Sequence, residues 1–349
     1  MSHSDLPSDS EQPLAPEASL PPVQPPSAGF ILQLFIIPGM IVLVVILVWL
    51  AFHWLAHMGS NPTEMIREMR QNNANSWQLA YNFSEELRLN EALRSDRELA
   101  GELASFLDQL LDEPLPPNAA EGSLMGGDPR GEEIVRLGFL CKALGEFMLP
   151  EVVLPVLIRA AGTHSDDDEL RVRLAALEAI ALLIENTREH ELRENKALET
   201  FLLAASEHQD HKIATRAAVA LSSMGNDRAT KRLVAMLQEP QHVDVHYNAA
   251  MGLARSGDAA CLEILLEMLD PSEQRALVDE PNENVRRLKR TRILLNALRA
   301  SQLLAKQNRE ADLTQLQEAV KRLLQTEDNL QIQMEGNVTL LALQDRNHS

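Results

Sequence analysis

Residues 217–237 read AAVALSSMGNDRATKRLVAML, and residues 249–269 read AAMGLARSGDAACLEILLEML. The two stretches coincide at an offset of thirty-two residues, with matching alanine pairs, leucines, a methionine and a central glycine. A period near thirty residues is typical of a stacked repeat array, in which each unit packs only on its neighbours. This internal copy therefore predicts the fold.

Each copy reads as two short helices separated by a turn. Gly225 and Gly257 stand where the first helix should end, since glycine readily adopts the left-handed backbone of a helix stop. The paired alanines allow close approach of neighbouring helices, and the leucines further on fill the layer beneath. A lone copy would leave this apolar face in water, so the copies should stack into an α-solenoid.

Residues 225–237 and 257–269 resemble the HEAT-like repeat of the phycobilin lyase type, in which G-D/N-x-x-A-x-x-x-L-x-x-x-L recurs. The resemblance implies an all-α fold, an α-solenoid of stacked helix pairs, which the uncharged run at 30–52 predicts to be preceded by one transmembrane helix. Because such repeats serve many unrelated proteins, it implies little about function.

The rest of the chain divides around this repeat. We expect a disordered proline-rich tail, a transmembrane helix with its interfacial end, juxtamembrane helices that form a possible N-terminal cap, a flexible linker, and the repeat solenoid with C-terminal capping helices. The corresponding boundaries are 1–29, 30–58, 59–112, 113–129 and 130–349. Within the solenoid, the second copy carries a charged insertion at 185–194.

The predicted anchor rests on residues 30–52, which carry no formal charge. As a helix they extend about 35 Å at 1.5 Å per residue, enough to span a bilayer. Arg67 and Arg70 follow the anchor, whereas the preceding tail has no Lys or Arg. The positive-inside rule then predicts a single-pass membrane protein with its repeat domain in the cytoplasm.

Composition limits the possible partners. A net charge of −19 argues against a general nucleic-acid binder, whose affinity rests on neutralising phosphates. The two cysteines, Cys141 and Cys261, lie in apolar helical patterns and read as buried thiols. We expect no cofactor and no catalytic residues, because no nucleophile, base and oxyanion donors occur at convincing spacing.

The turns between copies contain a recurring mixture of histidine and aspartate. Weak candidates for a metal site are His208, His211, His242 and His246, since imidazole and carboxylate are good zinc or iron ligands. His164 with the aspartates at 166–168 belongs to the same pattern. The alternative, which we favour, is that aspartates cap helices in these turns and that the histidines are ordinary loop residues.

A HEAT-like enzyme, deoxyhypusine hydroxylase, offers a comparison, because it holds iron with several His-Glu pairs on equivalent helices. Here only His190-Glu191 has that form, and it lies in the insertion. The chain therefore lacks the iron ligands that a hydroxylase of this type needs. A lyase that binds a pigment in the concave groove would need no such motif and stays as an alternative.

Residues 285–309 contain eight Lys or Arg and no acidic residue, which is unusual in an acidic chain. Helical spacing gathers several of these cations near one face, while Leu288, Leu295, Leu298 and Leu303 should pack inward. This face is either solvated and neutralised by the acidic repeats, or a docking strip for an acidic partner or anionic lipid. The partner-binding candidates are Arg286, Lys289, Arg292, Arg299 and Lys306.

The sequence thus predicts a non-catalytic, membrane-anchored HEAT-repeat scaffold or adaptor that binds a protein partner through its solenoid surface. The alternatives are an enzyme or cofactor-handling protein of the bilin-lyase or metal-hydroxylase type, and a regulatory subunit of a membrane transport or secretion complex. The residues shared by the copies serve packing, so function must lie where the copies differ.

Overall fold

The computed structural model forms two compact units, Met1–Ser60 and Asn61–Ser349. The residues that it describes are 28–57, 62–71, 76–117, 128–162, 170–187 and 192–345. The predicted disordered tail lies outside them, apart from its last two residues.

The described part of the first unit is a single helix, α1 (Ala28–His57). Its described side chains from Ile36 to Phe52 are all exposed. Among the residues that the structure describes, no helix is both long enough and apolar enough to cross a membrane. The anchor expected at 30–58 therefore stays a prediction.

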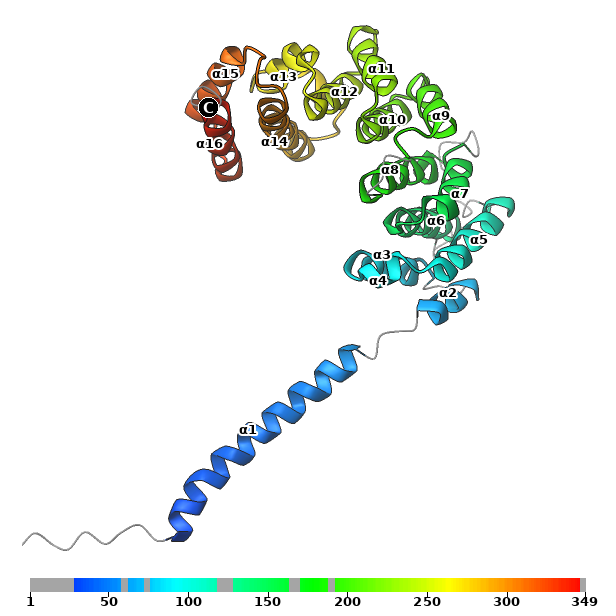
Figure 1. Ribbon diagram of the computed structural model, residues 1–349, viewed down its shortest axis with the longest axis vertical. Coiled ribbons are helices and arrows are strands. Elements are labelled where there is room, and N and C mark those ends of the chain that lie inside the picture. The colour runs from blue at the N-terminus through cyan, green and yellow to red at the C-terminus, as the bar shows by residue number, and fades with distance from the viewer. Residues whose placement is uncertain are drawn as a thin grey trace, which may run out of the picture. The chain divides into compact units, whose positions relative to one another are not determined.

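The second unit consists of helices stacked in two layers (Figure 1). Successive helices of the inner layer pack side by side along its concave face. They are α3 (Ser76–Leu89), α6 (Pro129–Glu146), α8 (Leu170–Asn186), α10 (His211–Met224), α12 (Val243–Ser256), α14 (Glu283–Gln307) and α16 (Leu330–Asp345). The outer layer holds α2 (Pro62–Arg70), α5 (Arg97–Asp112), α7 (Pro150–Gly162), α9 (Lys196–Ser206), α11 (Asp227–Gln238), α13 (Leu262–Met268) and α15 (Thr314–Thr326). This arrangement confirms the all-helical, solenoid-like repeat fold.

The duplicated stretch folds as the glycines predicted. Gly225 and Gly257 end α10 and α12 with φ of 59° and 79°, the left-handed region that a side chain makes unfavourable. Asn226 then caps α11, its side chain accepting the Ala229 N–H at 2.9 Å. Asp258 plays the same part in the next copy, where a 3₁₀ turn (Ala259–Cys261) precedes α13. Each turn is thus stabilised by one glycine and one cap.

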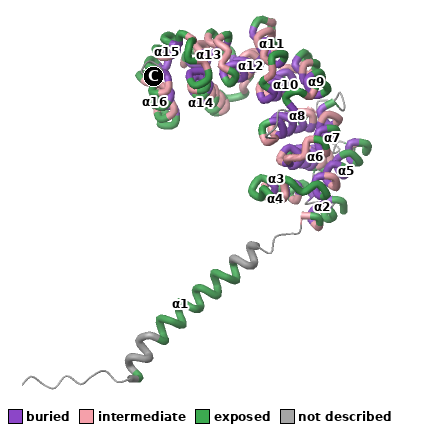
Figure 2. Tube along the Cα trace, viewed as in Figure 1, coloured by how far each residue is buried: buried purple, intermediate pink, exposed green. Residues whose placement is uncertain are grey.

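The core lies between the two layers and between successive inner helices. The paired alanines of the duplicated stretch are fully buried, as are the leucines that follow them in α10 and α12 (Figure 2). Cys141 and Cys261 are buried free thiols, and burial raises the pKa of each to about 12. They therefore stay protonated at neutral pH and serve packing.

Two asparagine or aspartate caps divide the helices near the N-terminal end of this unit. α3 ends before Asn90, whose side chain caps a separate short helix, α4 (Glu91–Arg94). Asp96 caps α5, although Ser95, directly before it, is also a good capping residue type. Ser95 instead ends α4, so the extended backbone that a cap requires falls one residue later.

Close approach between inner helices limits the size of the residue at Gly145 of α6. A Cβ there would lie 2.8 Å from both the Cα and the carbonyl oxygen of Ala179 in α8. Because backbone atoms cannot move aside cheaply, Gly145→Ala should lower the free energy of unfolding by about 1–3 kcal/mol. Urea denaturation followed by circular dichroism measures this change.

Gly101→Ala is the matched control, since a Cβ at Gly101 of α5 meets nothing within 4 Å. This substitution should raise stability by up to about 1 kcal/mol, because alanine is the better helix former. Equal effects of the two substitutions would contradict the close packing of α6 on α8.

Candidate functional site

The inner layer encloses a groove between α10, α12 and α14. Its cavity has a volume of about 430 Å³. Charged, amide and apolar side chains share its wall. The lining residues are Thr215, Arg216, Asp244, Tyr247, Asn248, Met251, Met268, Glu280, Val285, Leu288, Lys289, Arg292, Ile293 and Asn296. We call this cavity the inner groove.

Three lining residues occupy one sequence position that recurs in the repeats. Arg216, Asn248 and Asn296 each stand directly before a fully buried alanine of an inner helix. Because the alanine faces the neighbouring helix, the residue before it is turned about 100° towards the concave face. These residues were not among the candidates predicted from the sequence, although the repeat offset marks Arg216 and Asn248 as equivalent positions that differ.

Lys289 closes one side of the inner groove through two ion pairs. Its Nζ lies 3.0 Å from Asp244 Oδ2 of α12 and 3.0 Å from Glu280 Oε1. Burial opposes the charge, but the hydrogen bonds to Glu280 and Asp244 raise the pKa of Lys289 above its usual value. This candidate for partner binding therefore already joins α12 to α14.

Arg292 lies one turn further along α14 and is exposed to solvent. Within the described ranges, no carboxylate pairs with it. Arg216, across the groove on α10, has its Nε 2.5 Å from Glu178 Oε1. Arg292 is therefore the lining cation that can accept an external anion without losing an ion pair seen here.

The remaining candidates of the basic helix lie away from the groove lining. Arg299 has its Nε 3.3 Å from Glu335 Oε2 of α16. Arg286 and Lys306 are exposed and do not line the cavity. The strip predicted along one face of this helix is thus divided among three surroundings, because both α12 and α16 pack against α14.

Two leucines expected to pack inward are exposed. Leu288 is 67% exposed and lines the inner groove, and Leu303 is 37% exposed, whereas Leu295 and Leu298 are buried as predicted. Lys289 pairs with Asp244 in the first turn of α12, so Leu288 lies where α14 begins to extend beyond α12. At the other end, Asn308 donates to the carbonyl oxygen of Gly257 at the end of α12, so helix length does not account for the exposure of Leu303.

The candidate histidines form a stack and helix caps. The rings of His211 and His242 stack with centroids 4.0 Å apart and an angle of 16° between their planes. His242 also caps α12, its Nδ1 accepting the Asp244 N–H at 3.2 Å, while Nε2 lies 3.4 Å from Asp279 Oδ2. In α12 the cap is thus a histidine, in place of the aspartate expected from the sequence.

The other two histidines make similar local bonds. His208 Nδ1 accepts the Asp210 N–H at 2.9 Å, and Asp210 caps α10 as expected of the turn aspartates. His246 Nε2 lies 2.9 Å from the carbonyl oxygen of Glu239 and donates to it. Over the described residues, no three His, Cys, Asp or Glu side chains are arranged to hold a metal ion. His164 with the aspartates at 166–168, and His190-Glu191, lie outside those residues.

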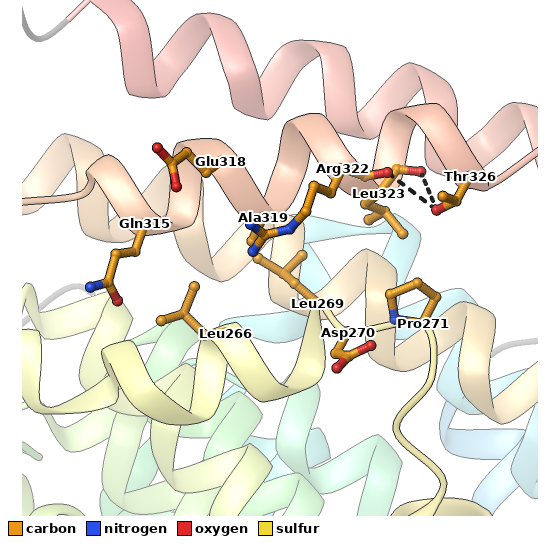
Figure 3. Close-up of a pocket in the computed structure, with 10 residues that line it drawn as sticks. All are labelled: Leu266, Leu269, Asp270, Pro271, Gln315, Glu318, Ala319, Arg322, Leu323 and Thr326. Carbon is orange, nitrogen blue, oxygen red and sulfur yellow. Dashed lines mark hydrogen bonds between the residues drawn. The ribbon is translucent and has the colours of Figure 1, made fainter.

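A second cavity lies in the outer layer between α13 and α15 (Figure 3). Its volume is about 600 Å³. Leu266, Leu269 and Leu323 form its apolar wall, and Glu318 and Arg322 come from α15. The cavity is the gap between the stacked outer helices α13 and α15. Its charged lining residues are Glu318 and Arg322 on α15, and Asp270, which follows α13.

Comparison with known proteins agrees with this architecture. Residues 245–271 match the family described as PBS lyase HEAT-like repeat. No curated protein matches the chain in sequence. Together with the stacked helix pairs, the family match confirms that the chain is a HEAT-like repeat protein.

Two engineered proteins are among the similar solved structures. A designed armadillo repeat protein is 17% identical, covers 69% of this chain and 99% of its own, and superposes with a TM-score of 0.39. A second engineered protein is 13% identical, covers 82% of this chain and 98% of its own, and has a TM-score of 0.34.

The histidine stack predicts a pH dependence of stability. Burial, and then repulsion from His242, lower the pKa of His211 below its usual value, against the opposing pull of Asp210 and Asp244. A lowered pKa means that the unfolded chain binds more protons, so stability falls as the pH drops below about 6.5. His211→Phe keeps a ring in the stack but cannot be protonated. Its melting temperature should fall less than that of the native chain between pH 7.5 and 5.5.

Differential scanning fluorimetry at the two pH values measures both falls. The change in melting temperature between pH 7.5 and 8.5 is the control. It should be the same for the two chains, because a histidine with a lowered pKa is neutral over that range. Equal falls for the two chains between pH 7.5 and 5.5 would show that the stack does not titrate against folding.

Proposed function

We propose that this protein is a membrane-anchored scaffold or adaptor that binds a partner protein in the inner groove and carries out no chemistry itself. The single observation that carries the proposal is the composition of the groove wall. An exposed leucine, an exposed arginine with no carboxylate partner among the described residues, and two asparagine amides line one cavity on the concave face.

Each of these groups matches a part of a polypeptide. Leu288 offers apolar surface to an apolar side chain, which is the component that supplies most binding free energy. Arg292 offers a charge to a carboxylate. Asn248 and Asn296 carry both a donor and an acceptor, as does a peptide group. A segment with an acidic residue next to an apolar one therefore suits the groove.

A nucleic-acid partner is the less favoured class. Lys289 is held between Asp244 and Glu280, and Arg216 pairs with Glu178, so most cations near the groove are already neutralised. The chain as a whole carries a net charge of −19. Phosphate backbones would be repelled by such a surface, since their binding depends on excess positive charge.

Support for the anchor comes from the sequence of α1 and from its exposure. Residues 30–52 are uncharged, and large side chains such as Trp49 and Phe52 are 62% and 68% exposed. An exposed apolar surface of this length must be covered by something other than water, and a lipid bilayer fits it. Arg67 and Arg70 then favour the cytoplasmic side for the repeat unit.

The lining of the inner groove indicates that Arg292 is the charged side chain that contacts the partner. Arg292→Glu places an acidic side chain where a carboxylate of the partner should lie. We expect capture of that partner from a detergent extract to fall at least tenfold at low salt, measured by quantitative mass spectrometry of co-purified proteins. Raising the salt concentration should weaken capture by the native chain as well, because the interaction is partly electrostatic.

Arg286→Glu is the matched control, with the same change of charge on the same helix at an exposed position outside the groove lining. Leu288→Ser tests the apolar contact without changing charge. Proteins that Arg286→Glu retains, and that both groove variants lose, are the specific partners. A capture profile that is identical in all four chains would contradict binding in the inner groove.

The anchor predicts where the chain is found after cell fractionation. The full chain should remain in the membrane pellet after an alkaline carbonate wash, because a spanning helix is held by its apolar length. Removal of residues 30–58 should move it to the supernatant. A wash that releases the full chain as readily as the shortened one would argue for peripheral attachment or none.

One observation favours a second function. The matched family is described by the name of a lyase, and such a protein could hold a pigment on its concave face. Visible absorption of the purified chain, together with metal analysis, separates the two functions. A stoichiometric chromophore, zinc or iron would favour cofactor handling, whereas a colourless, metal-free chain that retains its partner would favour the scaffold. A regulatory subunit of a transport or secretion complex would differ only in the identity of that partner.

A further inference from the structure

Helix α16 has two contrasting faces. One face is buried through Ile332, Thr339 and Leu343 and packs against α14 and α15. The opposite face carries four large apolar side chains that are 54–74% exposed. They are Leu330, Met334, Val338 and Leu341. Their spacing of four, four and three residues places them in one stripe along the helix.

The position of α16 in the array shows what this face lacks. α14 packs between α12 and α16, whereas in the described chain α16 has only α14 as an inner-layer neighbour. The exposed stripe thus faces the side on which a further inner helix would stack. Within a repeat array, an apolar face of this kind is covered by a stacked neighbour. In the described chain, the stripe on α16 has none.

The stripe is complementary to itself when two copies of α16 run antiparallel. Val338 lies near the middle of the helix, with Met334 four residues before it and Leu341 three residues after it. A two-fold axis at Val338 therefore opposes Val338 to its own copy and Met334 to Leu341 of the other copy. Such a contact closes on itself, as an interface between two identical patches must.

The charges on this face also suit a second copy. Between Leu330 and Leu341 the other exposed residues are Gln331 and Asn337, so no like charges meet at the axis. Asp345 is exposed at the C-terminal end of α16, where its own helix dipole disfavours a carboxylate. In the antiparallel pair it lies beside the N-terminal end of the other α16, where the helix dipole favours a carboxylate and the exposed Asp328 opposes it.

We propose that two copies of this chain associate through α16, with the helices antiparallel about a two-fold axis near Val338. The inner layers of two repeat arrays then continue into each other. The pair carries two inner grooves, so a partner with two binding segments gains avidity without any new contact. The interface itself is independent of what the grooves bind.

Cysteine cross-linking of the full-length chain tests the geometry. The natural cysteines are buried and give no background. Val338→Cys brings two thiols to the axis, and mild oxidation should convert most of the chain to a disulfide-linked dimer. Leu330→Cys places the thiols about 24 Å apart along the helices at 1.5 Å per residue, so it should not link to itself. A mixture of Leu330→Cys and Asp345→Cys chains should form the mixed dimer.

Every other occupant of the face gives a different pattern, and each overturns the proposal. A parallel pair links Leu330→Cys to itself as readily as Val338→Cys. A head-to-tail contact with the exposed Tyr81 of α3 links Val338→Cys to Tyr81→Cys and yields higher oligomers, because such a contact does not close. A lipid surface leaves all variants unlinked in detergent.

Sedimentation of the full-length chain in mild detergent gives an independent measurement. The double substitution Met334→Glu with Leu341→Glu should convert the dimer to a monomer at equal concentration, with the helical content unchanged. Gln325→Glu is the control, since it adds a carboxylate at an exposed position on the neighbouring α15. Retention of the dimer by the double variant would overturn the proposal, as would a monomeric native chain.

Discussion

The close packing of neighbouring inner helices is the contact on which the rest of the structure depends. It is possible only because small residues stand at the crossings: buried alanine pairs in α10 and α12, Gly145 against Ala179, and Gly252, whose Cβ would lie 2.8 Å from the Cβ of Ser222. Successive inner helices are in contact from α3 to α16 in the described chain. The two layers, the curvature and the inner groove all follow from this stacking.

The same constraint separates stability from function within each repeat. Side chains that face a neighbouring helix must be small or apolar, so they are alike from copy to copy. The residue before the packing alanine faces the groove instead and is free to vary, as arginine in α10 and asparagine in α12 and α14. A repeat array can thus acquire a binding surface without changing its core. Here that surface carries Arg292 and Leu288, to which we assign the partner contact.

Ion pairs at the groove serve mainly to join helices. Lys289 of α14 pairs with Asp244, which lies in the first turn of α12. His242 caps the same end of α12. The cap, the histidine stack and the groove wall are therefore adjacent parts of one repeat junction. This arrangement explains why histidine and aspartate recur in the turns without forming a metal site in the described chain.

The sequence by itself determined the repeat, because its information is local: the thirty-two-residue offset, the turn glycines at 225 and 257, and helical spacing are properties of neighbouring residues. Only the tertiary structure decided which surface residues share a site. Five cations of one helix looked equivalent in sequence, yet α12 and α16 cover different parts of that helix and leave Arg292 facing the groove without a carboxylate partner in the described chain. Leu288 likewise read as a core residue and is exposed, because exposure depends on where the neighbouring helices end, which no local pattern records.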